Sequence, residues 1–186
     1  MSEITVIDNF IALEYQLHIK KLIDNSELPV YYSPTTTTGY VGLYPYDKQF
    51  ENPQFTHKFI DNYQINSDWW ETIKPMENLF FKKIKHDKFG KLKKCKLNLN
   101  YQMNVSSNDC FIIHKDMEDV NGITAIYYVN DCDGSTLFFN ETGEKVIKEI
   151  KPKQGSMVYF DNQILHAGQP TLKNNYRAVI NFNWLY

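Results

Sequence analysis

Two histidines and one aspartate have the types and the spacing that could hold a metal ion. His114 and Asp116 lie two residues apart in the segment FIIHKDM, and His166 follows 50 residues later in QILHAGQP. If FIIHKDM forms a strand, the side chains of His114 and Asp116 point the same way, because residues i and i+2 of a strand share a face. Two imidazoles and one carboxylate, with the other coordination positions open, are the ligand set of mononuclear non-haem iron(II) sites. The spacing therefore predicts a metal site made by His114, Asp116 and His166.

An arginine follows these residues at a position where it could bind an anion beside the metal. Arg177 lies eleven residues after His166, in NNYRAVINFNW. The alternation of this segment predicts a strand with Arg177, Val179 and Asn181 on one face. A guanidinium can bind a carboxylate through two parallel, charge-assisted hydrogen bonds. We therefore expect Arg177 to bind a carboxylate near the metal, and the alternative is an ordinary surface arginine.

The second half of the chain shows the sequence pattern of a β protein. Short runs rich in β-branched and aromatic residues recur about every ten residues from about Lys93 onward, and turn residues such as Asn121-Gly122 and Asp133-Gly134 separate them. Regular short strands with turns between them predict a β-sandwich or barrel. The expected strands are 96–103, 111–116, 123–129, 137–140, 145–150, 156–160 and 177–184.

The first half is expected to be more helical. Apolar residues recur at helical spacing over 10–23, after a short β-rich run at 4–7. A second helix is predicted from about Ser67, a good N-cap, with a kink or break at Pro75. Between them, 31–50 mixes tyrosines with threonine, proline and glycine, which favours extended segments and a loop. Its tyrosines are expected to be half-buried aromatics under a long loop.

Composition narrows the class of protein. The 186 residues carry a net charge of −2, which argues against a protein dedicated to nucleic acid. Cys95, Cys110 and Cys132 show no CxxC spacing, so buried free thiols in a reducing compartment are expected rather than disulfides or a zinc site. We expect a cytoplasmic, single-domain protein over 1–186, with helical support and a substrate loop in 1–92 and a β core in 93–186. The lysine-rich segment 82–96 is either a solvated hairpin or helix end, or a patch for an acidic protein or nucleic acid.

Taken in order, the motifs of the second half resemble those of the 2-oxoglutarate and iron(II)-dependent dioxygenases, within them the prolyl 4-hydroxylase-like branch. The ordered set runs from HKD at 114–116 through IYYVN at 126–130, GSTLFF at 134–139 and PKQG at 152–155 to His166, Pro170 and Arg177. The opening ITVIDNF, followed by a helix, is also typical of the family.

This resemblance implies a fold and an activity. The fold would be a mainly β, double-stranded β-helix (a cupin-like jelly roll) with supporting N-terminal helices. The activity would be hydroxylation of a protein or peptide side chain, most simply prolyl, with decarboxylation of 2-oxoglutarate to succinate and CO₂. Fe(II), 2-oxoglutarate and O₂ would be required and ascorbate would assist, although manganese competes for such ligands. The carboxylate of Asp116 favours hydroxylation over halogenation. The alternatives are a hydroxylase of a small molecule such as a free amino acid, or a non-catalytic metal-binding barrel.

The resemblance also implies that the loop within 31–50 would close as a lid over a peptide substrate, as the alternative to half-buried aromatics under a loop. It implies roles for individual residues as well. Arg177 would bind the distal carboxylate of 2-oxoglutarate, and the hydroxyl of Tyr128 would reach the same group unless Tyr128 is a packed core residue. A further polar contact would come from the strand before HKD, where Gln102 or Asn104 is expected. Relatives that repair alkylated nucleic acid carry a second arginine six residues after the first. This chain has Asn183 there, so nucleic acid is not expected as a partner.

Overall fold

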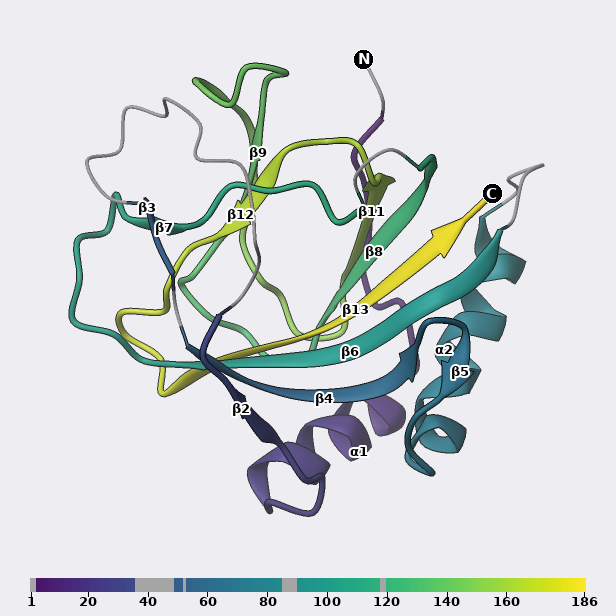
Figure 1. Ribbon diagram of the computed structural model, residues 1–186. Helices are drawn as coiled ribbons and strands as arrows, with labels where there is room; N and C mark the ends of the chain where they lie inside the picture. The colour runs from purple at the N-terminus through teal and green to yellow at the C-terminus, as the bar shows by residue number, and fades with distance from the viewer. Residues whose placement is uncertain (1–2, 36–48, 52, 85–89, 118–119) are drawn as a thin grey trace.

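The computed structural model describes residues 3–35, 49–51, 53–84, 90–117 and 120–186 (Figure 1). None of the helices in these ranges is long and apolar enough to cross a membrane. The elements are β1 (Thr5–Ile7), α1 (Leu13–Asp24), β2 (Tyr31–Ser33), β3 (Gln49–Phe50), β4 (Gln54–Asp61), β5 (Gln64–Ile65), α2 (Trp70–Lys83), β6 (Lys91–Tyr101), β7 (Cys110–Phe111), β8 (Gly122–Tyr128), β9 (Thr136–Phe139), β10 (Val146–Ile150), β11 (Met157–Asp161), β12 (His166–Gly168) and β13 (Tyr176–Leu185).

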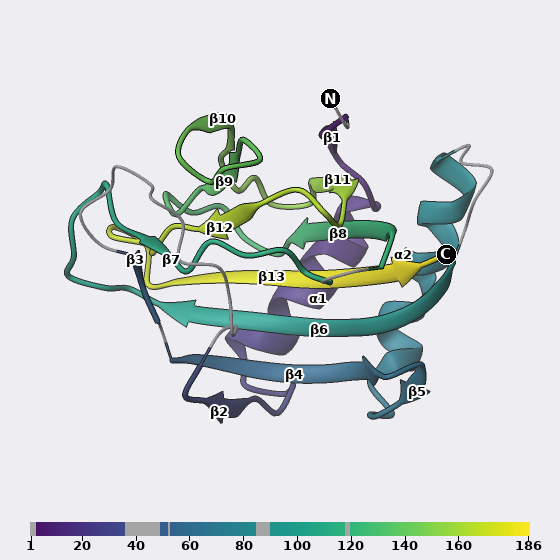
Figure 2. The ribbon, with the colours of Figure 1, turned by 45° about the horizontal axis from the view of Figure 1, so that its top comes forward.

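One large antiparallel sheet forms the frame of the molecule. Its strand order is β1-β11-β8-β13-β6-β4-β2, and β5 adds to the edge of β4. The helices α1 and α2 lie along one face of this sheet (Figure 2). Alternate residues of β13, from Ala178 to Trp184, pack with the helices in one apolar core, as the alternation of that segment predicts. The opposite face of β13 is therefore left for the site.

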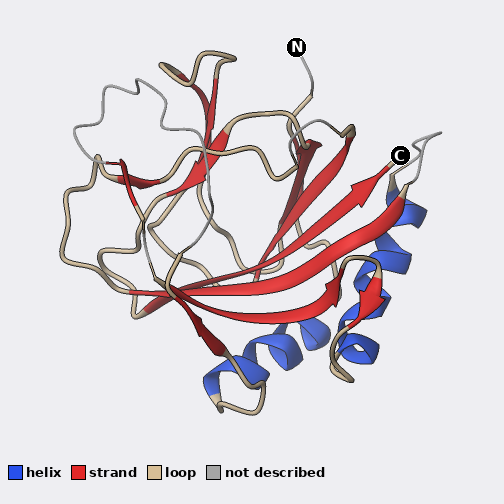
Figure 3. Ribbon diagram, in the orientation of Figure 1, coloured by secondary structure: helices blue, strands red, loops and turns tan. Residues whose placement is uncertain are grey.

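A smaller sheet covers that opposite face. Its order is β10-β9-β12, and a third pair, β3 with β7, lies beside it (Figure 3). Residues of β8, β9, β11 and β13 meet between the two layers in an apolar cluster that includes Tyr128, Phe138, Phe160 and Val179. The expectation of a mainly β protein built from facing antiparallel sheets, with helices supporting it, is confirmed.

Aromatic packing fixes α2 against the large sheet. Trp184 is 1% exposed, and its ring stacks on Phe80 of α2 at 4.5 Å and on Phe182 at 5.5 Å between centroids. The predicted break at Pro75 does not occur, because α2 runs through it without interruption. A proline removes one backbone donor from the helix. The buried side chains of Ile73, Met76 and Phe80 hold the helix on the sheet despite that loss.

The β core reaches further into the first half than predicted. The strand β4 pairs with β6, so residues well before 93 belong to the main sheet. The segment QFTHKFID was not predicted as a strand, because its inward-facing residue His57 is polar. His57 is nevertheless buried, and its ring nitrogens lie 2.6 Å from the Pro29 carbonyl oxygen and 2.8 Å from the Ser67 hydroxyl.

Two further expectations concern side chains outside the main sheet. The three cysteines are buried and free, as predicted. Tyr31 and Tyr32 are exposed rather than half-buried. The lid expectation falls mainly on 36–48, and part of the lysine-rich segment falls on 85–89; both stretches lie outside the described residues.

Candidate metal centre and co-substrate pocket

The two histidines are brought together by the backbone. His166 begins β12, and His114 forms a two-residue bridge with it in which each amide donates to the other's carbonyl at 3.0 Å. The predicted strand 111–116 is therefore shorter than expected, since β7 ends at Phe111 and His114 pairs alone. Asp116 lies outside any strand, yet it reaches the same point: one ligand atom from each of the three residues lies within 4.8 Å of the others.

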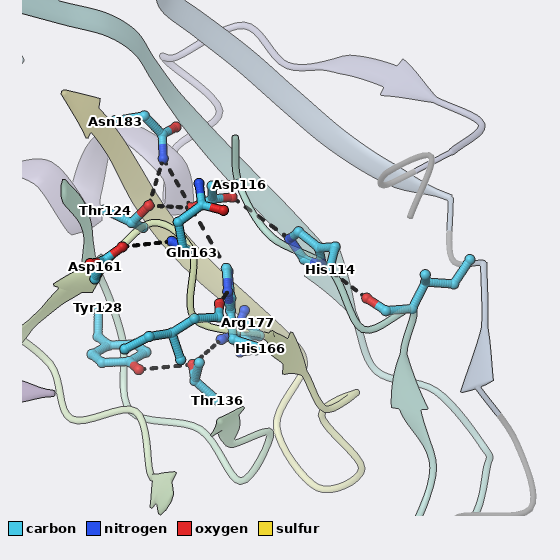
Figure 4. Close-up of polar contacts among 12 residues, drawn as sticks. His114, Asp116, Thr124, Tyr128, Thr136, Asp161, Gln163, His166, Arg177 and Asn183 are labelled. Atoms are coloured by element: carbon cyan, nitrogen blue, oxygen red, sulfur yellow. Dashed lines mark hydrogen bonds and ion pairs between the residues drawn. The ribbon is translucent and has the colours of Figure 1, made fainter. Parts of the chain in front are cut away.

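Hydrogen bonds orient both imidazoles for metal binding. Nδ1 of His114 lies 2.9 Å from the Ile112 carbonyl oxygen, and Nδ1 of His166 lies 3.0 Å from that of Ile164. A neutral imidazole that donates through Nδ1 keeps its lone pair on Nε2. Both Nε2 atoms face Asp116, at 3.7 Å for His114 and 3.8 Å for His166 (Figure 4).

The protonation states suit a metal ligand set as well. Burial, followed by the neighbouring His166, lowers the pKa of His114 to about 4, so its ring is neutral at pH 7. Burial opposes ionisation of Asp116, but the two imidazoles and a hydrogen bond from Thr124 lower its pKa to about 2. Two neutral imidazoles and one carboxylate are the donor set that fits iron(II) with open positions.

Two polar side chains hold the Asp116 carboxylate in place. The Thr124 hydroxyl donates to Oδ2 at 2.7 Å, and the Asn183 amide donates to the same oxygen at 2.9 Å. Asn183 also donates to the Thr124 hydroxyl at 3.0 Å, so the three groups form a closed triangle (Figure 4). From the sequence, Asn183 was noted only because it stands where relatives that repair alkylated nucleic acid carry a second arginine. Its place on the Arg177 face of β13 was the signal that it belongs to the site.

Arg177 lies in the same cavity, buried at 5% exposure. Its Nε donates to the Gly134 carbonyl oxygen and its Nη2 to the Thr136 hydroxyl, both at 2.9 Å. Tyr128 donates its own hydroxyl to Thr136 at 2.8 Å. Burial raises the pKa of Tyr128 to about 12, so it stays a donor. The structure thus links Tyr128 to Arg177 through Thr136 and leaves the Nη1 donors of Arg177 without a partner among the described residues.

A cavity of about 130 Å³ joins the metal ligands to Arg177. Its floor is the inner face of two neighbouring strands of the large sheet. These two strands contribute Lys94, Lys96, Asn98 and Asn100 from β6 and Arg177, Val179, Asn181 and Asn183 from β13.

Neither of the two residues predicted as the third co-substrate contact, Gln102 and Asn104, lies at the cavity. Gln102 lies beyond the end of β6 and donates to the Leu172 carbonyl oxygen at 2.6 Å. Gln102 and Asn104 are both exposed, and neither lines the cavity. The residue beside Arg177 is Asn100, its cross-strand partner, which is 4% exposed and has a buried Nδ2 without a hydrogen-bond partner in the described structure.

Comparison with known proteins adds independent support for the fold. No curated protein matches the chain. A 2OG-Fe(II) oxygenase family oxidoreductase of Burkholderia pseudomallei aligns with a TM-score of 0.72 at 12% identity, over 98% of this chain and 84% of that one. A prolyl hydroxylase of Trichoplax adhaerens, solved with a hypoxia inducible factor peptide, gives 0.67 at 15% identity, over 98% and 83%. A prolyl-4-hydroxylase of Pseudomonas putida gives 0.64 at 13% identity, over 100% and 94%.

These neighbours share the jelly-roll architecture, which confirms the predicted double-stranded β-helix. The family model described as the 2OG-Fe(II) oxygenase superfamily matches residues 99–186, the stretch that contains the three candidate ligands and Arg177. This stretch of the chain is therefore similar to the 2OG-Fe(II) oxygenase superfamily.

Proposed function

We propose that the protein hydroxylates a side chain of a protein or peptide, with decarboxylation of 2-oxoglutarate to succinate and CO₂. The observation that carries this proposal is the convergence of His114, Asp116 and His166 on one point of a cavity that also contains a buried arginine. These three residues would hold Fe(II). When bound, iron(II) with 2-oxoglutarate and O₂ supplies the oxidising power to place a hydroxyl on an unactivated carbon.

The residues of the chain would bind and orient the co-substrate. Arg177 would bind the distal carboxylate of 2-oxoglutarate through its Nη1 donors, because its Nε and Nη2 already serve the protein. Thr136 and Tyr128 would fix the guanidinium rather than touch the co-substrate. Asn100 would supply the third polar contact, since its unpartnered amide nitrogen lies beside Arg177.

The peptide assignment is supported by the structural neighbours. Three proteins of similar fold are prolyl hydroxylases, and one of them was solved with a peptide. Prolyl hydroxylation of a peptide is therefore the substrate class to examine first. The free, buried thiols of the three cysteines support a reducing compartment such as the cytoplasm.

Hydroxylation of a small molecule, such as a free amino acid, is the second candidate. The feature that favours it is the cavity wall formed by β6, where polar and charged side chains stand instead of an apolar surface for a prolyl ring. Such a wall suits a substrate with its own charges.

A product screen tests the proposal. The protein is incubated with Fe(II), ascorbate, 2-oxoglutarate and either a proline-containing peptide pool or the free amino acids. We expect one substrate to gain one oxygen atom by mass spectrometry, with succinate formed in equal amount. Succinate without any oxygenated product in either pool would contradict both substrate classes, and an oxygenated amino acid alone would select the second.

A further inference from the structure

Beyond the metal ligands and Arg177, the cavity contains three cations that the proposed function does not use. Lys94, Lys96 and Lys115 line it, and none of their ammonium groups has a hydrogen bond or ion pair within the described part of the chain. Asp116 is the one carboxylate among the described lining residues, and metal binding would occupy it. In a chain of net charge −2, this cavity is therefore a local positive site.

Lys96 is partly buried, whereas Lys115 is exposed. Burial, reinforced by Lys94, lowers its pKa to about 8, although Asp116 acts in the opposite direction. An ammonium taken out of water without an acceptor is unfavourable, and a bound anion removes that cost. The cross-strand neighbour Lys58 contrasts with it, because Lys58 is more exposed and pairs with Asp61 at 2.7 Å.

Two amides next to Lys96 also lack partners. The side-chain oxygens of Asn98 and Asn181 are buried and accept no hydrogen bond from any described residue. Asn181 is only 8% exposed and pairs in register with Lys96. Since nearly all buried polar atoms in proteins are hydrogen-bonded, these two oxygens are available to accept N–H donors from a molecule bound in the cavity.

The register separates this cluster from the Arg177 end of the cavity. Asn181 lies four residues along β13 from Arg177, which corresponds to about 13 Å in a strand. The next cavity-facing residue, Asn183, hydrogen-bonds Asp116. Lys96 and Asn181 therefore lie toward the metal end, where a substrate must approach, while Arg177 lies at the other end.

We propose that Lys96, Asn98 and Asn181 form a substrate subsite for a carboxylate. The ammonium of Lys96 would bind the carboxylate, and the two amide oxygens would accept N–H groups of the same molecule. This inference rests on the proposed function and narrows its substrate to one with a carboxylate close to the carbon that is hydroxylated. The carboxylate belongs either to an acidic residue next to the target in a peptide or to the α-carboxylate of a free amino acid.

Matched probe pairs test the subsite by binding alone. Calorimetry on protein loaded with Mn(II) and 2-oxoglutarate would compare L-proline with L-prolinamide, and N-acetyl-Pro-Glu-amide with N-acetyl-Pro-Gln-amide. We expect the carboxylate member of at least one pair to bind about ten- to a hundredfold more tightly, the range of a hydrogen bond to a charged group. The pair that discriminates identifies the source of the carboxylate.

Three variants test whether the preference for the carboxylate probe depends on Lys96 and Asn181. Lys96→Met keeps the apolar stem, and we expect it to abolish the discrimination. Asn181→Asp places a negative charge beside Lys96 and should weaken the carboxylate probe in particular. Lys93→Met is the control, since it removes the same charge from a β6 position outside the cavity and should leave the discrimination intact. Thermal melting of each variant verifies that it is folded.

Several results would overturn the subsite. These are equal affinity for both members of each pair in the wild type, no binding of either at millimolar concentration, discrimination that survives Lys96→Met, or a loss of 2-oxoglutarate affinity instead of probe affinity in that variant. A different result would refute the proposed function without refuting the subsite. If the carboxylate probes bind as expected but no succinate is ever formed, the subsite stands and the oxygenase proposal falls.

Discussion

Replacing Asn183 by alanine should weaken metal binding even though Asn183 is not a ligand. The side chain donates to Oδ2 of Asp116 at 2.9 Å and to the Thr124 hydroxyl at 3.0 Å. Without it, Thr124 alone orients the carboxylate, and Oδ1 is no longer held toward His114. The metal then has to select one of several carboxylate rotamers.

The magnitude follows from the contacts that are lost. A hydrogen bond to a charged group is worth about 1.5–3 kcal/mol. Since Thr124 remains, one such bond to Asp116 is lost, which corresponds to about a ten- to hundredfold lower metal affinity. Asn183→Ala and Thr124→Val should not be additive, because the two side chains also bond to each other.

Anaerobic titration with Fe(II), or with Mn(II) as a redox-stable substitute, measures the affinity directly. Asn181→Ala is the matched control, because Asn181 lies on the same face of β13 but has no bond to Asp116 in the described structure. An Asn183→Ala protein with a lower melting temperature and unchanged metal affinity would show that Asn183 only stabilises the fold, and our account of the site would be wrong there.

Three further outcomes are expected. Arg177→Met should raise the KM for 2-oxoglutarate by about a hundredfold or more, since two charge-assisted hydrogen bonds are lost, while calorimetry should find metal affinity nearly unchanged. Trp184→Ala should lower the free energy of unfolding by about 3–5 kcal/mol in urea denaturation, because the ring is buried between Phe80 and Phe182. Binding of a carboxylate probe should fall by about tenfold per pH unit above pH 8, since Lys96, with its pKa lowered to about 8, loses its charge there; affinity that is flat to pH 10 would contradict this.

The sequence predicted those parts of the site that depend on residue type and short-range alternation. Arg177, Val179 and Asn181 face the cavity because β13 is a regular strand, and its other face packs on the helices as expected. The spacing of the sequence identified the three candidate ligands, but a shared strand face does not explain why they lie close together. His114 and Asp116 do not share a long strand, and the bridge between His114 and His166 brings the ligands together instead.

The features that were missed depend on contacts between distant segments. The Asn183–Thr124–Asp116 triangle joins three positions that are far apart in the chain, and no local pattern marks them. The place of Asn100 on the cavity wall beside Arg177 was missed in favour of Gln102 because the end of β6 cannot be located from sequence to within two residues. β4 was missed because its buried His57 is satisfied by a carbonyl and a hydroxyl from other segments.

We propose that His114, Asp116 and His166 hold the iron that drives turnover of 2-oxoglutarate. The most direct measurement is succinate formation by wild-type protein and by His166→Ala, each after anaerobic Fe(II) titration and with the fold verified by thermal melting. Wild type should bind one Fe(II) and form succinate, and His166→Ala should stay folded, bind iron at least about a hundredfold more weakly and form none. Succinate formation by the folded His166→Ala protein at the wild-type rate would contradict the claim.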